Sequence, residues 1–358
     1  TAIPSYLFAD TIALETIVIP DTVTSIGDGA FRESSALKNA IISDSVTVIG
    51  IQAFYGCKNL SSVTLSKGLV DLQQQAFGEC TKLTSITIPK SLERSSDGIY
   101  GGAFDHSGLA TVKFEDGVKM IPNYLFADAT TLETIVIPDS VTSIGVYSFA
   151  NCSALKNITI PYSVTEIGAQ AFYKCTSLKT IAIPDSIKTL DDGTFFGCNS
   201  LSNIKFPSLI TEIGSGMCDG CTSLVTVEMG DKVTSIGDNA FQNCTSLKNI
   251  TLSPETEYIN SNAFSNCDSL ESIVIPDKVT VIYHNAFSDC DKLLSVTLSK
   301  ALKQIGESAF NNCDSLTAIK IPDSVETIGE RAFYGCEKLA DVNMGNGVSK
   351  LYSEAFRL

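Results

Sequence analysis

The chain has no tryptophan and only two histidines among its 358 residues. Few histidines leave little material for imidazole acid–base catalysis or for His-ligated metal sites. Basic residues are also scarce, with 25 Lys and Arg against 40 Asp and Glu and a net charge of -15. This charge opposes polyanions, so no nucleic-acid partner is expected. No apolar run reaches the roughly 18 residues of a membrane span, so direct membrane insertion is not expected either.

The chain does have a strict internal repeat. A phenylalanine, usually preceded by alanine, recurs at intervals of 23 residues except on either side of Phe104, and this frame collects 15 of the 18 phenylalanines. We call this the anchor position; Cys218 occupies it in one further repeat. Such a period is typical of solenoids, in which stacked units bury together what no unit can bury alone. The anchors are Phe8, Phe31, Phe54, Phe77, Phe104, Phe126, Phe149, Phe172, Phe195, Phe241, Phe264, Phe287, Phe310, Phe333 and Phe356.

Each repeat contains an alternating apolar segment after its anchor. In the stretch from Leu178 to Ile183, apolar residues alternate with period two, which predicts one short strand per repeat. Pro184 follows directly, and a proline stops the strand because it has no N–H for the ladder. A later apolar pair, such as Val164 and Ile167, predicts a second short extended piece.

The segment around the anchor has a different spacing. Ala171, Cys175 and Leu178 lie four and three residues apart, which places them on one face of a predicted helical turn or two. Eleven of the twelve cysteines occupy the same position, three residues after the anchor. A continuous column gives each thiol two equivalent neighbours, so we expect buried free thiols rather than disulfides.

The run from Cys152 to Phe172 resembles the BspA-like leucine-rich repeat, also called the Treponema pallidum type. The resemblance implies an α/β repeat solenoid: a right-handed leucine-rich repeat superhelix with a parallel sheet on its concave side and short extended and helical turns on its convex side. It also implies an extracellular or cell-surface protein that adheres to host or microbial proteins or glycans. Members share no catalytic residues, so neither an enzyme nor a cofactor is expected.

The frame predicts a single domain over residues 1–358, with about 15 repeats and an irregular stretch at 93–109. Extra residues there are expected to form a surface loop, which is either a non-repetitive functional element or a product of neutral drift. Both ends fall within a repeat without a polar cap, which suggests a fragment of a longer protein or end-to-end self-association. The loop candidates are Glu93, Arg94, Asp97, Tyr100 and His106.

Three patterns are suggestive of chemistry, and each has a plainer interpretation. Cys218 and Cys221 have the C-x-x-C spacing of zinc or redox sites, but Cys218 only replaces an anchor, so we interpret it as a packing defect beside Met217. Aspartates recur after the strand-ending proline, and we interpret them as turn formers rather than Ca²⁺ ligands. The sequence neighbours in 105–107, Asp-His-Ser, cannot form a catalytic triad by themselves.

Strand residues between the buried positions must point outward and form a candidate binding face. They are mostly Thr, Ser and Asn, without the aromatic anchors typical of protein hot spots. This surface could therefore bind a protein or glycan or be passive, and the chain could instead be a structural spacer. Tyrosines such as Tyr55 and Tyr173 lie on the turn side, which is an alternative surface for a partner. The candidate residues are Thr64, Thr87, Thr111, Lys113, Thr134, Asn157, Thr159, Thr180, Asn203 and Lys205.

Overall fold

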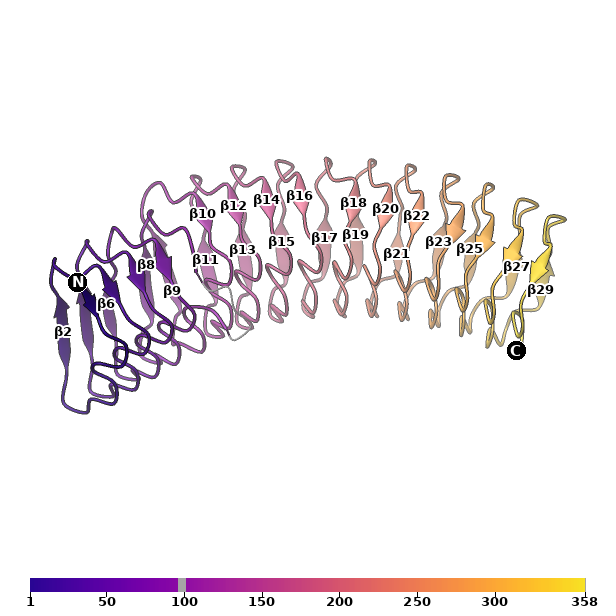
Figure 1. Ribbon diagram of the computed structural model, residues 1–358. Helices are drawn as coiled ribbons and strands as arrows, with labels where there is room; N and C mark the ends of the chain where they lie inside the picture. Colours follow the sequence, from indigo (N-terminus) through magenta and orange to yellow (C-terminus); the bar gives the residue numbers. More distant parts are fainter. Residues whose placement is uncertain (96–100, 358) are drawn as a thin grey trace. The chain divides into compact units, whose positions relative to one another are not determined.

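The computed structural model describes residues 1–95 and 101–357. It divides into two compact units, Thr1–Pro184 and Asp185–Leu358. Each unit is a parallel-strand solenoid in which a repeat contributes two short strands (Figure 1). First-row strands follow the anchor and its leucine, and second-row strands precede the next anchor. The expected single domain stays a prediction.

The first unit has two rows of parallel strands. In the first row β2, β4 and β6 form one sheet, β8 and β9 a second, and β11, β13 and β15 a third. Most pairs are offset by the 23-residue repeat, as in Thr134 opposite Asn157. The first row is β2 (Thr16–Ile19), β4 (Asn39–Ile42), β6 (Ser62–Thr64), β8 (Ser85–Ile88), β9 (Thr111–Phe114), β11 (Thr134–Val136), β13 (Asn157–Thr159) and β15 (Thr180–Ala182); the second is β1 (Ala2–Ile3), β3 (Ser25–Ile26), β5 (Val48–Ile49), β7 (Asp71–Leu72), β10 (Met120–Ile121), β12 (Ser143–Ile144) and β14 (Glu166–Ile167).

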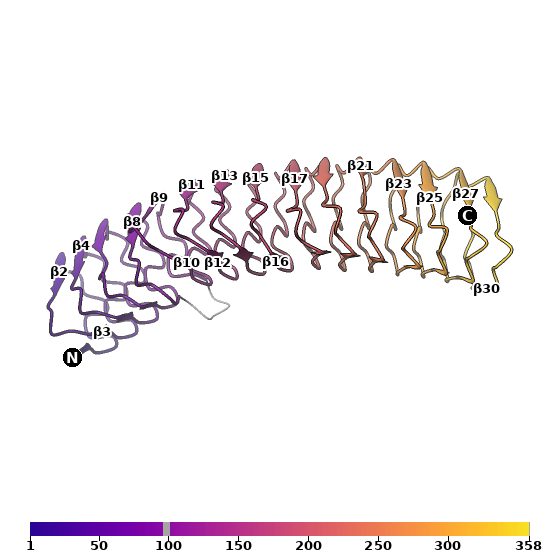
Figure 2. The ribbon, with the colours of Figure 1, turned by 90° about the horizontal axis from the view of Figure 1, so that it is seen from above.

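The second unit repeats this plan (Figure 2). Strands β17 to β25 of the first row form one sheet, β27 and β29 another, and the second-row strands β18 to β30 a third. The first row is β17 (Asn203–Lys205), β19 (Thr226–Glu228), β21 (Asn249–Ile250), β23 (Ser272–Val274), β25 (Ser295–Thr297), β27 (Ala318–Lys320) and β29 (Asp341–Asn343); the second is β16 (Thr189–Leu190), β18 (Glu212–Ile213), β20 (Ser235–Ile236), β22 (Tyr258–Ile259), β24 (Val281–Ile282), β26 (Gln304–Ile305), β28 (Thr327–Ile328) and β30 (Lys350–Leu351).

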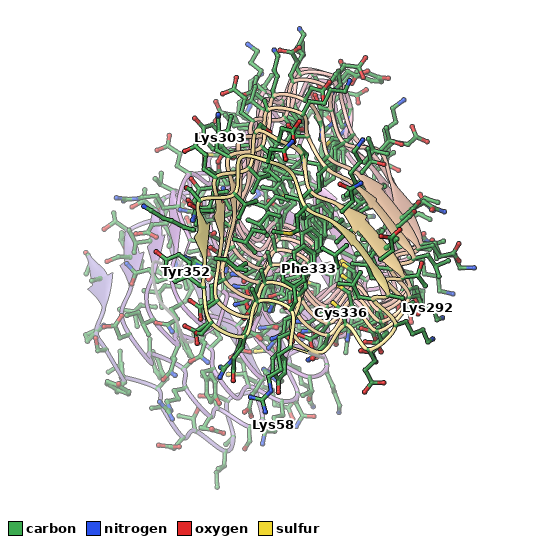
Figure 3. All side chains as sticks on the ribbon, turned by 90° about the vertical axis from the view of Figure 1, so that its right-hand side faces the viewer. Lys58, Lys292, Lys303, Phe333, Cys336 and Tyr352 are labelled. Carbon is green, nitrogen blue, oxygen red and sulfur yellow. The ribbon has the colours of Figure 1, made fainter. Side chains whose placement is uncertain are left out.

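The anchor phenylalanines form the core of each unit. Their rings stack with centroids 4.9 Å apart at Phe31 and Phe54 and 5.0 Å apart at Phe333 and Phe356. Figure 3 shows Phe333 and Cys336 inside the backbone coil of the second unit. Burial of a fully buried anchor ring such as Phe54 contributes about 1.5–3 kcal/mol, and parallel stacking adds to it.

The cysteines form a second buried column. All twelve are free and buried. The thiol of Cys175 donates a hydrogen bond to the carbonyl oxygen of Phe149, the anchor of the preceding repeat, at 3.1 Å. The same bond joins Cys290 to Phe264 at 3.2 Å. The column therefore links adjacent repeats, and the expected free thiols are confirmed.

The ring of Phe206 approaches the anchor column next to the repeat in which Cys218 replaces phenylalanine. The ring of Phe206, which is 2 % exposed, lies 6.3 Å from that of Phe241, edge-on at 75°. Phe206 belongs to the repeat before Cys218 and Phe241 to the repeat after it. We therefore assign to Phe206 the space that an anchor ring at position 218 would occupy.

The expected helical turns are absent from the part of the chain that the structure describes. Gln52 and Gly56, two residues on either side of the anchor Phe54, both have positive φ, at 54° and 70°. The N–H of Tyr55 donates to its own turn, at Gln52 O, whereas that of Phe54 donates to Ala76 O of the next repeat. Backbone N–H groups thus donate alternately to carbonyls of their own turn and of the next repeat. In an α-helix every N–H would instead donate to the carbonyl four residues earlier. Successive turns still direct every third or fourth side chain inward.

Candidate functional site

The outward-facing side chains of the first-row strands form what we call the strand face. In the first unit its predicted residues are all exposed, while Ile135 and Ile158 between them are buried. Asn203 and Lys205 are exposed in the second unit. The alternation is therefore confirmed; binding by these residues stays a prediction. Those of the first unit are Thr64, Thr87, Thr111, Lys113, Thr134, Asn157, Thr159 and Thr180.

Register brings several of these residues together. Thr134, Asn157 and Thr180 lie opposite one another on β11, β13 and β15. Thr87 lies opposite Lys113 on β8 and β9. Ser62, Ser85, Thr87, Thr111 and Lys113 contribute to the lining of a shallow polar hollow of about 330 Å³, whereas Thr64 does not.

A larger hollow, of about 820 Å³, lies at the carboxyl ends of β11, β13 and β15. We call it the apolar groove, and its volume is typical of ligand sites. Its exposed side chains include Val136, 79 % exposed, and Tyr162, 80 % exposed. Thr159 and Ala182 also line it. The rest of the lining includes the strand-ending Pro161 and Pro184 and the polar side chains of Asp139 and Ser163. The groove thus combines an aliphatic and an aromatic side chain with neighbouring hydroxyls.

Tyr162 occupies the turn position that holds aspartate in many other repeats. Those aspartates bond the next repeat rather than their own turn: Asp44 Oδ1 accepts the N–H of Lys67 at 2.9 Å, and Asp323 Oδ1 accepts that of Asn346 at 2.8 Å. The same bond from Ser208 lowers the pKa of Asp185. Tyr162 has no carboxylate for this bond and presents its ring to solvent instead.

Sequence reasoning missed the groove because it considered strand residues alone. Tyr162 lies three residues beyond the last outward position of β13, so it falls outside that set. The available signal was the interrupted aspartate column, because an aromatic residue replaces a polar turn former beside the outward-facing Val136 and Ala182.

The described residues of the irregular stretch, 93–95 and 101–109, form side-chain pairs with their neighbours. The guanidinium of Arg94 lies 3.7 Å from the carboxylate of Asp71. His106 bonds the adjacent Asp105, and this bond raises the pKa of His106. Ser107 Oγ is buried and has no hydrogen-bond partner among the described residues, so it is not hydrogen-bonded to His106. Glu93 is exposed, and Asp97 and Tyr100 lie outside the described residues.

No group of three His, Cys, Asp or Glu side chains able to hold a metal ion occurs within residues 1–95 and 101–357. Cys218 and Cys221 are both fully buried, and burial raises the pKa of the Cys218 thiol well above its ordinary value. A buried neutral thiol is unreactive, which fits a packing role for this pair. Within the same residues, no helix has the length and apolar character needed to cross a bilayer.

The family model described as BspA type leucine-rich repeat region, with six copies, matches residues 1–133, 119–248 and 234–358. The chain belongs to the BspA-type leucine-rich repeat family. This resemblance, inferred from residues 152–172, is therefore confirmed. Leucine-rich repeat proteins generally bind other molecules rather than catalyse reactions, so membership suggests a protein-binding module.

Solved structures of this BspA-type chain's relatives agree with the fold. A leucine-rich repeat protein of Bacteroides ovatus is 26 % identical, with a TM-score of 0.62, and the match covers 96 % of this chain and 84 % of that one. The pneumococcal vaccine antigen PcpA is 18 % identical, with a TM-score of 0.51 and coverage of 97 % and 82 %, which is a likeness of fold alone. No curated protein sequence matches the chain.

Proposed function

We propose that this chain is a non-catalytic binding module that recognises an extended protein segment on the strand face of its first unit, anchored in the apolar groove. The observation that carries the proposal is that Tyr162 and Val136, both largely exposed, line one groove together with Thr159. Tyrosine is enriched among residues that dominate binding energy, because its ring buries a large area with few rotatable bonds.

The groove suits a chain-like ligand. It lies across three consecutive repeats, and neighbouring parallel strands are about 4.8 Å apart. Thr159 and the hydroxyl of Tyr162 offer hydrogen bonds beside the apolar floor. An extended peptide can place one apolar side chain against Val136 and Tyr162 and its polar backbone against these groups.

We further propose an extracellular or cell-surface setting and an adhesin-type role, supported by membership in the BspA-type family. The same family membership supports a right-handed superhelix, with the strand face on its concave side. A glycan is the alternative ligand, favoured by the polar hollow beside Thr87, Thr111 and Lys113. A structural spacer that projects another domain would need no ligand at all.

The proposal is tested by replacing two groove residues, Tyr162 and Val136, with the residues that neighbouring repeats have at the same positions. Tyr162→Asp introduces the aspartate of the flanking repeats, and Val136→Thr introduces the threonine of β13, so the double variant should fold. Peptides selected on the wild-type chain from a displayed library of random dodecapeptides should bind it saturably and bind the double variant at least about tenfold more weakly.

Val274→Thr is the matched control, because Val274 has the same strand position in the second unit and is 64 % exposed. This control should leave binding unchanged. Equal peptide binding by the double variant would contradict the groove as the anchor. Binding on a glycan array without any peptide ligand would favour the glycan, and saturable binding of neither class would favour the spacer.

A further inference from the structure

A second candidate site lies in the turn layer of the first unit, around the anchors rather than on the strand face. Tyr124 and Tyr147 precede their anchors by two residues in consecutive repeats, and Tyr173 follows the next anchor. The rings of Tyr124 and Tyr147 stack with centroids 5.0 Å apart, and that of Tyr173 meets Tyr147 edge-on at 6.1 Å. These three rings line a cavity of about 200 Å³ together with Asp128 and Asn151.

The cavity contains a fixed and partly desolvated carboxylate. Asn151 Nδ2 donates a hydrogen bond to Asp128 Oδ1 at 2.8 Å, which orients the carboxylate. Burial, and then the like charge of Asp105, raise the pKa of Asp128, while the bond from Asn151 and the charge of His106 lower it. The balance is upward, chiefly because the carboxylate is partly buried. A cation in the cavity would favour the charged form of this carboxylate.

The same layer shows that its tyrosines accept cations. Arg32 lies over the ring of Tyr55 at 5.2 Å, and Lys174 lies over that of Tyr173 at 5.0 Å. Within the part of the chain that the structure describes, no lysine or arginine lies over the ring of Tyr124 or Tyr147. A ring face attracts an ammonium group by its quadrupole, most strongly where water is excluded.

The backbone shows that the stacked pair is not a requirement of the fold. Tyr124 and Tyr147 have φ of 56° and 52°, a region that is unfavourable for bulky residues. The segment Tyr-Leu-Phe-Ala-Asp occurs twice, at 6–10 and at 124–128. After the first copy, Gly29 stands at the position of Tyr147, so Tyr6 has no ring at the equivalent position of the next repeat.

We propose that Tyr124, Tyr147 and Asp128 form a cage for the ammonium group of a lysine side chain presented by a partner protein; Tyr173, whose ring already carries Lys174, borders this cage. The volume of about 200 Å³ lies below the 300–1,000 Å³ of sites for drug-sized ligands, so it suits a single side-chain end rather than a metabolite or an oligosaccharide. The net charge of -15 favours a basic partner. This site is separate from the apolar groove and does not depend on the proposed function.

The test uses Nα-acetyl-lysine methylamide, whose side-chain ammonium group is free, as the probe and its norleucine analogue as the uncharged control. Binding is followed by the NMR signals of ¹³C-labelled tyrosine rings, and a dissociation constant of about 1–10 mM is expected for a single side chain. The norleucine analogue should not shift these signals. Equal shifts from the two probes would show an apolar cavity and overturn the proposal, and so would the absence of shifts from the lysine probe.

Variants separate the cage from the fold. Tyr147→Gly introduces the residue found at position 29 and suits the positive φ, so it should fold and weaken lysine binding at least about tenfold. Tyr147→Phe keeps the ring and should bind normally. Asp128→Asn keeps the shape, loses the charge and should also weaken binding, which tests the proposal even if the glycine variant is unstable.

Two controls address specificity. Tyr6→Leu changes the copy that lacks the stacked pair and should leave lysine binding unchanged, as should the groove double variant Tyr162→Asp with Val136→Thr. Unchanged binding by Asp128→Asn, or by a folded Tyr147→Gly, would refute the cage. Loss of lysine binding in the groove variant would place the lysine at the strand face instead.

Discussion

Restoration of the anchor ring by Cys218→Phe should lower the stability of the wild-type chain. In combination with Phe206→Ala it should offset part of the stability that Phe206→Ala loses. Phe206 is 2 % exposed, Cys218 is fully buried and the ring of Phe206 reaches to 6.3 Å from that of Phe241. Cys218→Phe therefore overfills an occupied space and should cost about 1–3 kcal/mol of unfolding free energy. Phe206→Ala leaves a cavity and should cost about 3–5 kcal/mol.

The double variant places a ring in the space that Phe206→Ala vacates. Its loss of stability should therefore be smaller than the sum of the two single losses by about 0.5–3 kcal/mol. Urea unfolding measured by far-ultraviolet circular dichroism and by tyrosine fluorescence gives the four free energies, and coincident curves test whether the transition is two-state.

Ile275→Ala is the matched control for this cycle. Ile275 occupies the strand-end position of Phe206 in a later repeat and is 2 % exposed. Its effect should add to that of Cys218→Phe within about 0.5 kcal/mol. If the effects of Phe206→Ala and Cys218→Phe on unfolding free energy were also additive within this limit, the assignment of Phe206 to the space of the missing anchor would be refuted.

Two further predictions concern titration and reactivity. In the native chain the twelve buried thiols should resist Ellman's reagent, and all twelve should react after unfolding in urea; rapid reaction of the native chain would contradict the buried column. The bond to Asp105 raises the pKa of His106, so its NMR titration midpoint should lie above about 6.5 and fall in Asp105→Asn. Because the folded-state pKa is the higher one, this pair stabilises the fold fully below about pH 6.5, and that contribution is lost as the pH rises through the folded pKa; a midpoint unchanged by Asp105→Asn would contradict it.

The sequence predicted those features that depend on one repeat and its exact copy. Period-two alternation predicted the strands, the proline marked where they end, and the 23-residue frame placed Thr134 opposite Asn157. These features follow from the frame because parallel strands in register repeat one environment many times.

Features that depend on backbone conformation were not predictable in the same way. The spacing of Ala171, Cys175 and Leu178 fits a helix, but successive turns with positive φ also direct such residues inward. The sequence predicted the aspartates only as turn formers, whereas the carboxylate of Asp44 accepts a hydrogen bond from the N–H of Lys67 in the next repeat. Both differences arise because the backbone donors of one repeat find acceptors in its neighbour.

The candidate sites combine departures from the frame in neighbouring repeats. Tyr162 interrupts an aspartate column, and it becomes part of a groove only when Val136 and Ala182 of the adjacent repeats are placed beside it. Likewise, Tyr124 and Tyr173 come from different repeat positions and meet only around Tyr147. When each repeat position is considered by itself, these tyrosines are isolated exceptions and do not indicate a site.

Hydroxyl-radical footprinting of side chains in the complex with a selected peptide tests the central claim, recognition at the apolar groove, most directly. We predict that peptide binding lowers the oxidation of Tyr162 and Val136 and leaves that of Val274 unchanged. Undiminished oxidation of Tyr162 in the saturated complex, with protection elsewhere on the chain, would contradict the claim.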